Sequence, residues 1–171
     1  TVADTLCDLS VSEPIPAMPI DPPTLTMTFF VNTSPLAGKS GKKLTSRMIG
    51  ERLFKEAETN IALKVEQSEN NEAFEVSGRG ELQLGILIET MRREGFELSV
   101  SRPRVVMQTN ENGEKLEPIE DVVIDVDDEF SGVVIEKMTK RKATITEMKA
   151  SGGGKTRIVF SAPSRGLIGY L

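Results

Sequence analysis

The fold is decided by Phe74–Val100, FEVSGRGELQLGILIETMRREGFELSV, in which two kinds of hydrophobic periodicity follow one another. Phe74 and Val76 alternate with polar residues, which predicts a strand, and Gly78-Arg79-Gly80 ends it. Apolar residues then return every three or four positions, as on one face of a helix, at Leu84, Leu87, Ile88 and Met91. Gly95 is placed to end that helix, and alternation resumes at Phe96, Leu98 and Val100. The stretch therefore predicts a β-α-β unit.

The residues on its N-terminal side extend this unit. Alternation over 24–31 predicts a strand, and residues 44–58 have helical spacing after a loop rich in Gly, Ser and Lys. A second alternation at 61–65 forms a hairpin with the strand that contains Phe74. The order βαββαβ over residues 24–106 is the split-βαβ, or ferredoxin-like, motif.

A second round of the same pattern follows. Residues 117–126 are rich in β-formers, the apolar residues of 130–138 have helical spacing, and two further strands are predicted at 143–148 and 156–162. The fold class is therefore α+β, with two ferredoxin-like units, the second (107–171) stopping after βαββ. We expect the chain to be a piece of a longer protein. We also expect a neighbouring or swapped copy to cover the sheet edge that the truncation exposes.

Composition limits the chemistry. The 171 residues contain no histidine and one cysteine, which excludes His/Cys zinc sites, histidine-based triads and an intrachain disulfide. The single thiol favours a reducing, cytoplasmic location, and neither a signal peptide nor an apolar run of membrane-spanning length is visible. We expect no catalytic residue, no metal site, no cofactor and no membrane partner.

Charge is segregated along a chain whose formal net charge is −5. Residues 39–55 carry six basic side chains against Glu51, and residues 137–157 carry seven against Glu147. Between them, residues 114–129 carry eight acids against Lys115. The two basic runs could hold phosphates, or they could be solvated faces that the acidic run partly neutralises.

Three short motifs could bind a ligand, and each also has a purely structural interpretation. Ala37–Ser40 resembles the end of a phosphate-binding loop, but Thr33 replaces its first glycine and Pro35 lacks an N–H, so we disfavour nucleotide binding through Lys39. Gly152–Gly154 could cradle a phosphate or form a hairpin tip. Asp127–Glu129 could hold a hard cation, although capping of the following helix is favoured.

Several motifs resemble the TypA/BipA branch of the translational GTPases, which are related to elongation factor G. They run through the chain as Ile20–Met27 (IDPPTLTM), Val31–Pro35 (VNTSP), Thr45–Arg47, Glu58–Asn60, Val76–Leu82 (VSGRGEL), Arg92–Glu97 (RREGFE), Ser101–Pro103, Glu117-Pro118 and Pro163–Tyr170 (PSRGLIGY). Gln83 stands where related factors often carry His. The resemblance implies that residues 1–23 are the end of a β-barrel domain plus a linker. It also implies that 24–106 are similar to the third domain of elongation factor G, and 107–171 to its last domain.

The resemblance also implies a function. The parent would be a ribosome-associated GTPase that acts in translation, ribosome assembly and stress adaptation, with its GTP- and Mg-binding domain before residue 1 and a family-specific domain after residue 171. The present chain would then be a non-catalytic portion that contacts ribosomal RNA and proteins. The candidate contacts are Lys39, Lys42, Lys43, Arg47, Lys137, Lys140, Arg141, Lys142, Lys155 and Arg165. The alternative is a regulatory module that binds a small effector between paired ferredoxin-like units.

Overall fold

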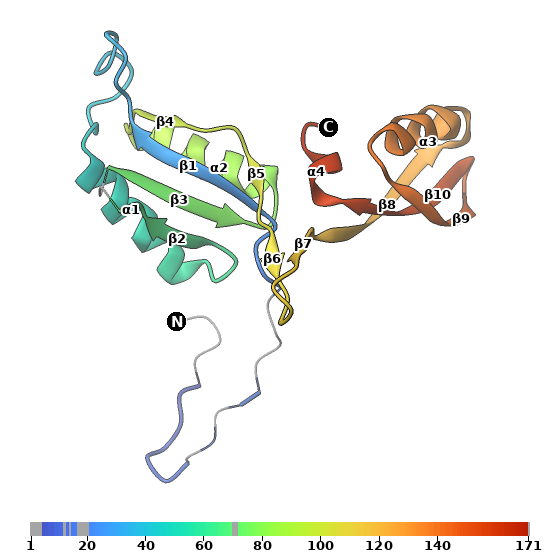
Figure 1. Cartoon of the computed structure of the whole chain (residues 1–171), viewed down its shortest axis with the longest axis horizontal. Helices are drawn as coiled ribbons and strands as arrows, with labels where there is room; N and C mark the ends of the chain where they lie inside the picture. The colour runs from blue at the N-terminus through green and yellow to red at the C-terminus, as the bar shows by residue number, and fades with distance from the viewer. Residues whose placement is uncertain (1–4, 12, 14, 17–20, 70–71, 171) are drawn as a thin grey trace. The chain divides into compact units, whose positions relative to one another are not determined.

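The chain forms two units, residues 1–104 and 105–171, each built on its own sheet (Figure 1). The computed structural model describes residues 5–11, 13, 15–16, 21–69 and 72–170, so part of the predicted 1–23 connector lies outside the described residues. The boundary falls between Arg104 and Val105, where the sequence placed it between 106 and 107.

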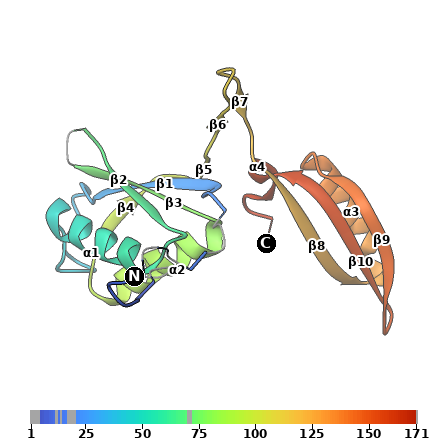
Figure 2. The same ribbon diagram turned by 90° about the horizontal axis from the view of Figure 1, so that it is seen from below.

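Unit 1 has the predicted βαββαβ order, and its α+β fold is confirmed. Its elements are β1 (Leu25–Val31), α1 (Ser46–Thr59), β2 (Lys64–Gln67), β3 (Ala73–Gly78), α2 (Glu81–Arg93) and β4 (Leu98–Val100). The strands are ordered β2-β3-β1-β4 with antiparallel neighbours, and a short β5 (Arg104–Val105) also pairs with β1. Both helices lie on one face of this sheet (Figure 2).

The strand register explains the core of unit 1. Phe29 lies opposite Phe74 and Met27 opposite Val76, so the alternate apolar residues of β1 and β3 share the face that the helices cover. Phe29, Phe74 and Val76 are almost completely buried. The core is therefore formed by the period-two residues that the sequence singled out.

The ends of the helices follow local rules. α1 begins at Ser46, two residues later than predicted, because Thr45 is its N-cap and accepts a hydrogen bond from the Met48 N–H (3.3 Å). Gly95 has φ +86°, and the bonds from Gly95 N to Arg92 O (3.1 Å) and from Phe96 N to Met91 O (3.0 Å) form a Schellman motif. The predicted glycine stop of α2 is confirmed.

Unit 2 repeats the first four elements of unit 1. It contains β8 (Ile119–Asp127), a 3-10 turn η1 (Asp128–Phe130), α3 (Ser131–Lys140), β9 (Thr144–Gly152), β10 (Lys155–Pro163) and a short α4 (Ser164–Leu167). A small hairpin, β6 (Gln108–Thr109) and β7 (Lys115–Leu116), surrounds the predicted turn at 110–113 and was not expected. The sheet order is β8-β10-β9. Within the described residues β8 has β10 as its neighbour, whereas the equivalent β1 is paired on both sides.

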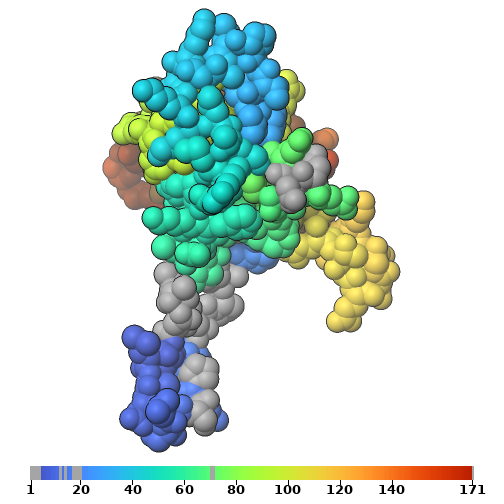
Figure 3. All heavy atoms as spheres, turned by 90° about the vertical axis from the view of Figure 1, so that its left-hand side faces the viewer, coloured from blue at the N-terminus to red at the C-terminus, as the bar shows by residue number. Residues whose placement is uncertain are grey.

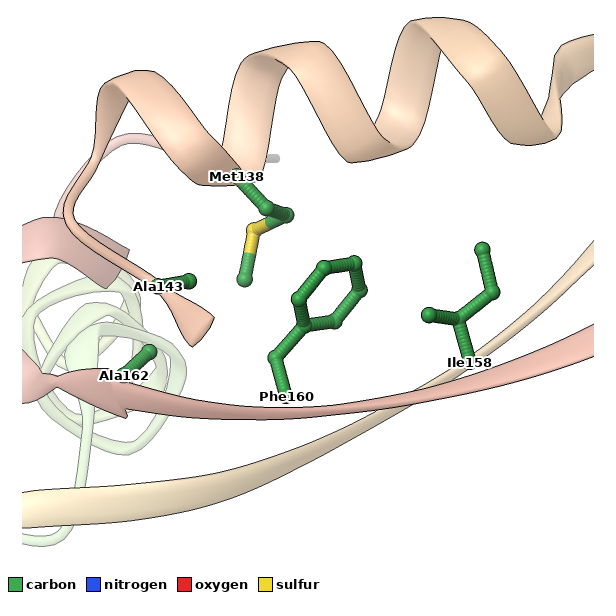
Figure 4. Packing of buried hydrophobic residues seen from close by; sticks show 5 residues of the cluster. All are labelled: Met138, Ala143, Ile158, Phe160 and Ala162. Atoms are coloured by element: carbon green, nitrogen blue, oxygen red, sulfur yellow. The ribbon is translucent and has the colours of Figure 1, made fainter. Parts of the chain in front are cut away.

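The core of unit 2 lies between α3 and the sheet. Met138 points from α3 toward Phe160 of β10, with Ile158, Ala143 and Ala162 beside them (Figure 4). Met138, Ile158 and Phe160 have no exposed surface.

No helix in the described part of the chain has the length and apolar character needed to cross a membrane.

Candidate nucleic-acid interface

The loop between β1 and α1 carries the first group of candidate contacts. It projects beyond the end of the unit 1 sheet (Figure 1) and forms the blue-to-cyan region at the top of Figure 3. Lys39 and Lys42 are exposed there, and neither has an acidic partner among the described residues. These two cations are therefore available to an external anion.

The backbone of this loop binds the Glu97 carboxylate. One carboxylate oxygen accepts hydrogen bonds from Gly38 N (3.0 Å) and Asn32 Nδ2 (2.7 Å), and the other from Ser40 N (2.9 Å) and Gly41 N (3.0 Å). Desolvation raises the pKa of Glu97, but these four bonds together outweigh it and leave the pKa below its ordinary value. The N–H groups that a phosphate-binding loop would offer to a nucleotide are thus already occupied, and this argues against the nucleotide interpretation of Ala37–Ser40.

Other members of the first basic run have partners within unit 1. The Lys43 ammonium lies 4.6 Å from the centre of the Phe96 ring, a cation-π contact. Arg47 pairs with Glu51 (2.8 Å) on the exposed surface of α1, and Arg52 binds both Glu94 and Glu56. The run is consequently less cationic in space than it is in sequence.

The second group of candidates lies at the C-terminal end of α3. Lys137 and Lys142 are exposed and have no acidic partner in the described part of the chain, whereas Lys140 pairs with Glu136.

Lys142 has φ +69° and is the one described non-glycine residue with positive φ. It occupies the Schellman position after α3, with Lys142 N bonded to Thr139 O and Ala143 N to Met138 O (both 3.0 Å). A lysine is thus held at a position that favours glycine.

Arg141 and Arg165 are engaged internally. The Arg141 guanidinium donates to the carbonyls of Gly166 (2.7 Å), Ile168 (2.9 Å) and Gly169 (3.0 Å) and lies 5.3 Å from the Tyr170 ring centre. Arg165 pairs with Glu117 (2.7 Å). Arg141 therefore fastens the segment after β10 to the end of α3, a role that its place in a basic run does not indicate.

The acidic run partly neutralises the basic run across the sheet of unit 2. Arg157 of β10 lies directly opposite Asp125 of β8 and binds it with two hydrogen bonds (2.8 and 2.7 Å). This bonding lowers the pKa of Asp125 and raises that of Arg157. Lys155 faces Asp127 at 4.0 Å in the same way. The opposite charges of residues 114–129 and 137–157 are thus partly a cross-strand pattern.

Two motif interpretations are decided by local geometry. Gly153 and Gly154 have positive φ (63° and 73°) and form the tight turn between β9 and β10, as the hairpin alternative predicted. Asp127 is the N-cap residue of η1 and Asp128 and Glu129 lie in its first turn, as the capping alternative predicted, but Asp127 makes no side-chain cap bond. The Asp128 carboxylate accepts a bond from Thr156 Oγ1 (2.6 Å). The described residues include no group of acids arranged to hold a metal ion.

A groove of about 570 Å³ lies between the end of α1 and the start of α2. Its apolar lining includes Leu82 and Ile86, which are 70% and 58% exposed. The polar group at its edge is satisfied internally, because Gln83 accepts from Arg79 N (2.8 Å) and donates to Asn60 Oδ1 (3.5 Å). The groove lies within unit 1.

The fold is a pair of α+β units, each built on an antiparallel sheet. Residues 114–171 match the family described as "Elongation factor G C-terminus". The chain is also related to BipA proteins over nearly its whole length, which confirms the resemblance to the TypA/BipA family. It is 50% identical over 169 residues to the "Large ribosomal subunit assembly factor BipA" of Haemophilus influenzae and of Escherichia coli, and 49% identical to that of Bacillus subtilis.

These matches cover 99% of this chain but only 27–28% of each relative. A crystal structure of a Thermus thermophilus protein is also similar, with a TM-score of 0.52 and 13% identity over 92% of this chain and 38% of that one. At that identity the likeness shows the fold alone.

Glu97 is the site residue that sequence reasoning missed. It lies in an alternating strand pattern, where a polar residue is expected to face solvent. Its partners lie 56 to 65 positions away along the chain, so no local pattern could have revealed them.

Proposed function

We propose that this chain is a non-catalytic, ribosome-docking portion of a TypA/BipA-like GTPase that acts in the cytoplasm in translation, ribosome assembly and stress adaptation. The observation that carries the proposal is the pair of exposed, uncompensated lysine sites, Lys39 with Lys42 and Lys137 with Lys142, on a chain whose net charge is −5. Local cations on an acidic chain favour contact with a polyanion at chosen points. The relatives that share half of its residues are called large ribosomal subunit assembly factors.

The two sites would contact RNA phosphates, which position a protein without reading the base sequence. Of the remaining candidates, Lys43 lies over Phe96, and Arg47, Lys140, Lys155 and Arg165 are in ion pairs. A basic side chain in an exposed pair of this kind can leave its acidic partner for a phosphate, because each pair contributes less than about 1 kcal/mol. Arg141 is the weakest candidate, because its donors hold backbone carbonyls.

The experiment measures binding of the whole chain to large ribosomal subunits by co-sedimentation at a series of salt concentrations. Two double variants reverse charge at each site, Lys39→Glu with Lys42→Glu and Lys137→Glu with Lys142→Glu. Each is expected to weaken binding and to reduce the slope of log K against log salt by about 2, or roughly one for each lost phosphate contact.

The matched control is Lys115→Glu, an exposed lysine inside the acidic run, made singly and in combination with Lys64→Glu to equal the charge change. Binding that ignores salt, or that weakens equally in the control, contradicts the proposal. If neither this chain nor a full-length TypA/BipA protein that contains it binds, the proposal also fails.

A further inference from the structure

The loop that presents Lys39 and Lys42 is fixed by an acid rather than left mobile. Glycine- and serine-rich loops are normally flexible, yet three N–H groups of this backbone converge on one carboxylate. Glu97 receives hydrogen bonds from the N–H groups of Gly38, Ser40 and Gly41. The fourth bond, from Asn32, fastens the start of the same loop.

Backbone contacts continue this attachment along the chain. Lys42 N and Lys43 N both donate to Gly95 O (3.1 Å each), and Glu97 N donates to Lys43 O (3.2 Å). A methyl group on Gly41 would lie 2.7 Å from Gly95 O, so the loop approaches residues 95–97 as closely as glycine allows. Lys39 and Lys42 therefore project from a backbone that is held on both sides of each residue.

The chemistry of the Glu97 partners matters for its role. Its carboxylate is satisfied by neutral N–H donors, and no ion pair joins it to a lysine in the described part of the chain. It thus orders the basic loop without using up either cation. A group whose purpose was to neutralise the loop would pair with Lys39 or Lys42.

We infer that Glu97 is a positioning residue for polyanion binding by Lys39 and Lys42, a role that rests on the proposed function. A loop ordered before binding does not lose that conformational entropy when it meets a phosphate backbone. Glu97 lies next to the basic run, so simple electrostatics and positioning predict opposite effects of removing it.

The test compares Glu97→Ala with Glu51→Ala in the binding titration described above. Glu51 belongs to the same basic run and pairs with exposed Arg47, so its removal adds local positive charge and is expected to leave binding unchanged or stronger. Glu97→Ala makes the same charge change but is expected to weaken binding by roughly three- to tenfold, because the loop must be ordered on binding. Glu97→Gln keeps one carbonyl acceptor, so its binding affinity is expected to lie between that of Glu97→Ala and that of the wild-type protein.

Amide hydrogen exchange of Gly38, Ser40 and Gly41 supplies a second measurement. Faster exchange at these amides, with unchanged exchange in β1 and β3, shows that the loop and not the unit has been released. Stronger or unchanged binding by Glu97→Ala overturns the positioning role while leaving the proposed function intact, provided that Lys39→Glu with Lys42→Glu still weakens binding. If that double variant binds normally, the proposed function fails at this loop.

Discussion

A methyl group placed on Gly50 of α1 would lie 2.6 Å from Cζ of Phe74 in β3. Gly50 is buried at the interface of α1 with the sheet, and Phe74 is almost fully buried below it and also meets Phe54 edge-on at 6.1 Å. The helix reaches the sheet at this distance because the side chain of residue 50 is absent. The close packing therefore offsets the cost of a glycine inside a helix.

Gly50→Ala is therefore expected to destabilise the chain by about 1–3 kcal/mol, because overpacking outweighs the better helix propensity of alanine. Gly85→Ala is the matched control, since an added methyl there on α2 meets no atom within 4 Å. It is expected to stabilise the chain by about 0.5–1 kcal/mol. Thermal and urea unfolding measure both changes, and equal effects of the two substitutions would contradict the packing argument.

Lys142→Gly is expected to raise stability and weaken binding together. The substitution relieves the positive-φ conformation at the end of α3 and is expected to stabilise unit 2 by about 0.5–1 kcal/mol after the entropy of glycine is subtracted. Loss of the cation removes one proposed phosphate contact. Urea unfolding and ribosome binding check the two outcomes, and a variant that is more stable but binds normally would remove Lys142 from the docking surface.

Arg141→Lys is expected to release the segment after β10 although it keeps the charge. A lysine cannot supply the planar fork that reaches the carbonyls of Gly166, Ile168 and Gly169, so about 1–3 kcal/mol of local stability is lost. Hydrogen exchange of residues 164–170 measures the release. Lys140→Ala, which breaks only the exposed pair with Glu136, serves as control and is expected to leave that exchange unchanged.

Acid is expected to release the loop that Glu97 holds. Because the pKa of Glu97 in the folded chain lies below the ordinary value of 4.5, its contribution to stability is complete above that value and is lost as the pH falls through the folded pKa. The amide resonances of Gly38, Ser40 and Gly41 should follow this titration with a midpoint below 4.5. They should lose that titration in Glu97→Gln, and a midpoint at or above 4.5 would show that the hydrogen bonds do not favour the carboxylate.

Much of the fold could be predicted because its signals are local. The period-two alternation around Phe74 and the helical spacing from Leu84 to Met91 each report a face that must be buried, and Gly95 marks a positive φ after α2. The small β6–β7 hairpin was missed because its strands are two residues each and have no buried face. α1 begins later than predicted because Leu44 fits the apolar spacing while Thr45 supplies the cap.

The candidate site was predicted less completely, because a count of charges along the chain does not show which of them are paired. Arg52 pairs with Glu94, which lies 42 positions away in the sequence, and Arg157 pairs with Asp125, which lies 32 positions away. Both pairs depend on how strands and helices are brought together. Sequence proximity placed Lys39 and Arg141 in equivalent basic runs, whereas the structure gives one an open surface and the other three carbonyl acceptors.

The sequence by itself determined the order of the longer strands and helices in both units, the absence of histidine chemistry and the location of the basic runs, since these depend on neighbours within a few residues. Only the tertiary structure decided which cations stay uncompensated and which acid holds their loop. The physical reason is that Coulombic and hydrogen-bond partners are chosen by distance in space, and here Glu97 reaches Gly41 across 56 positions of chain.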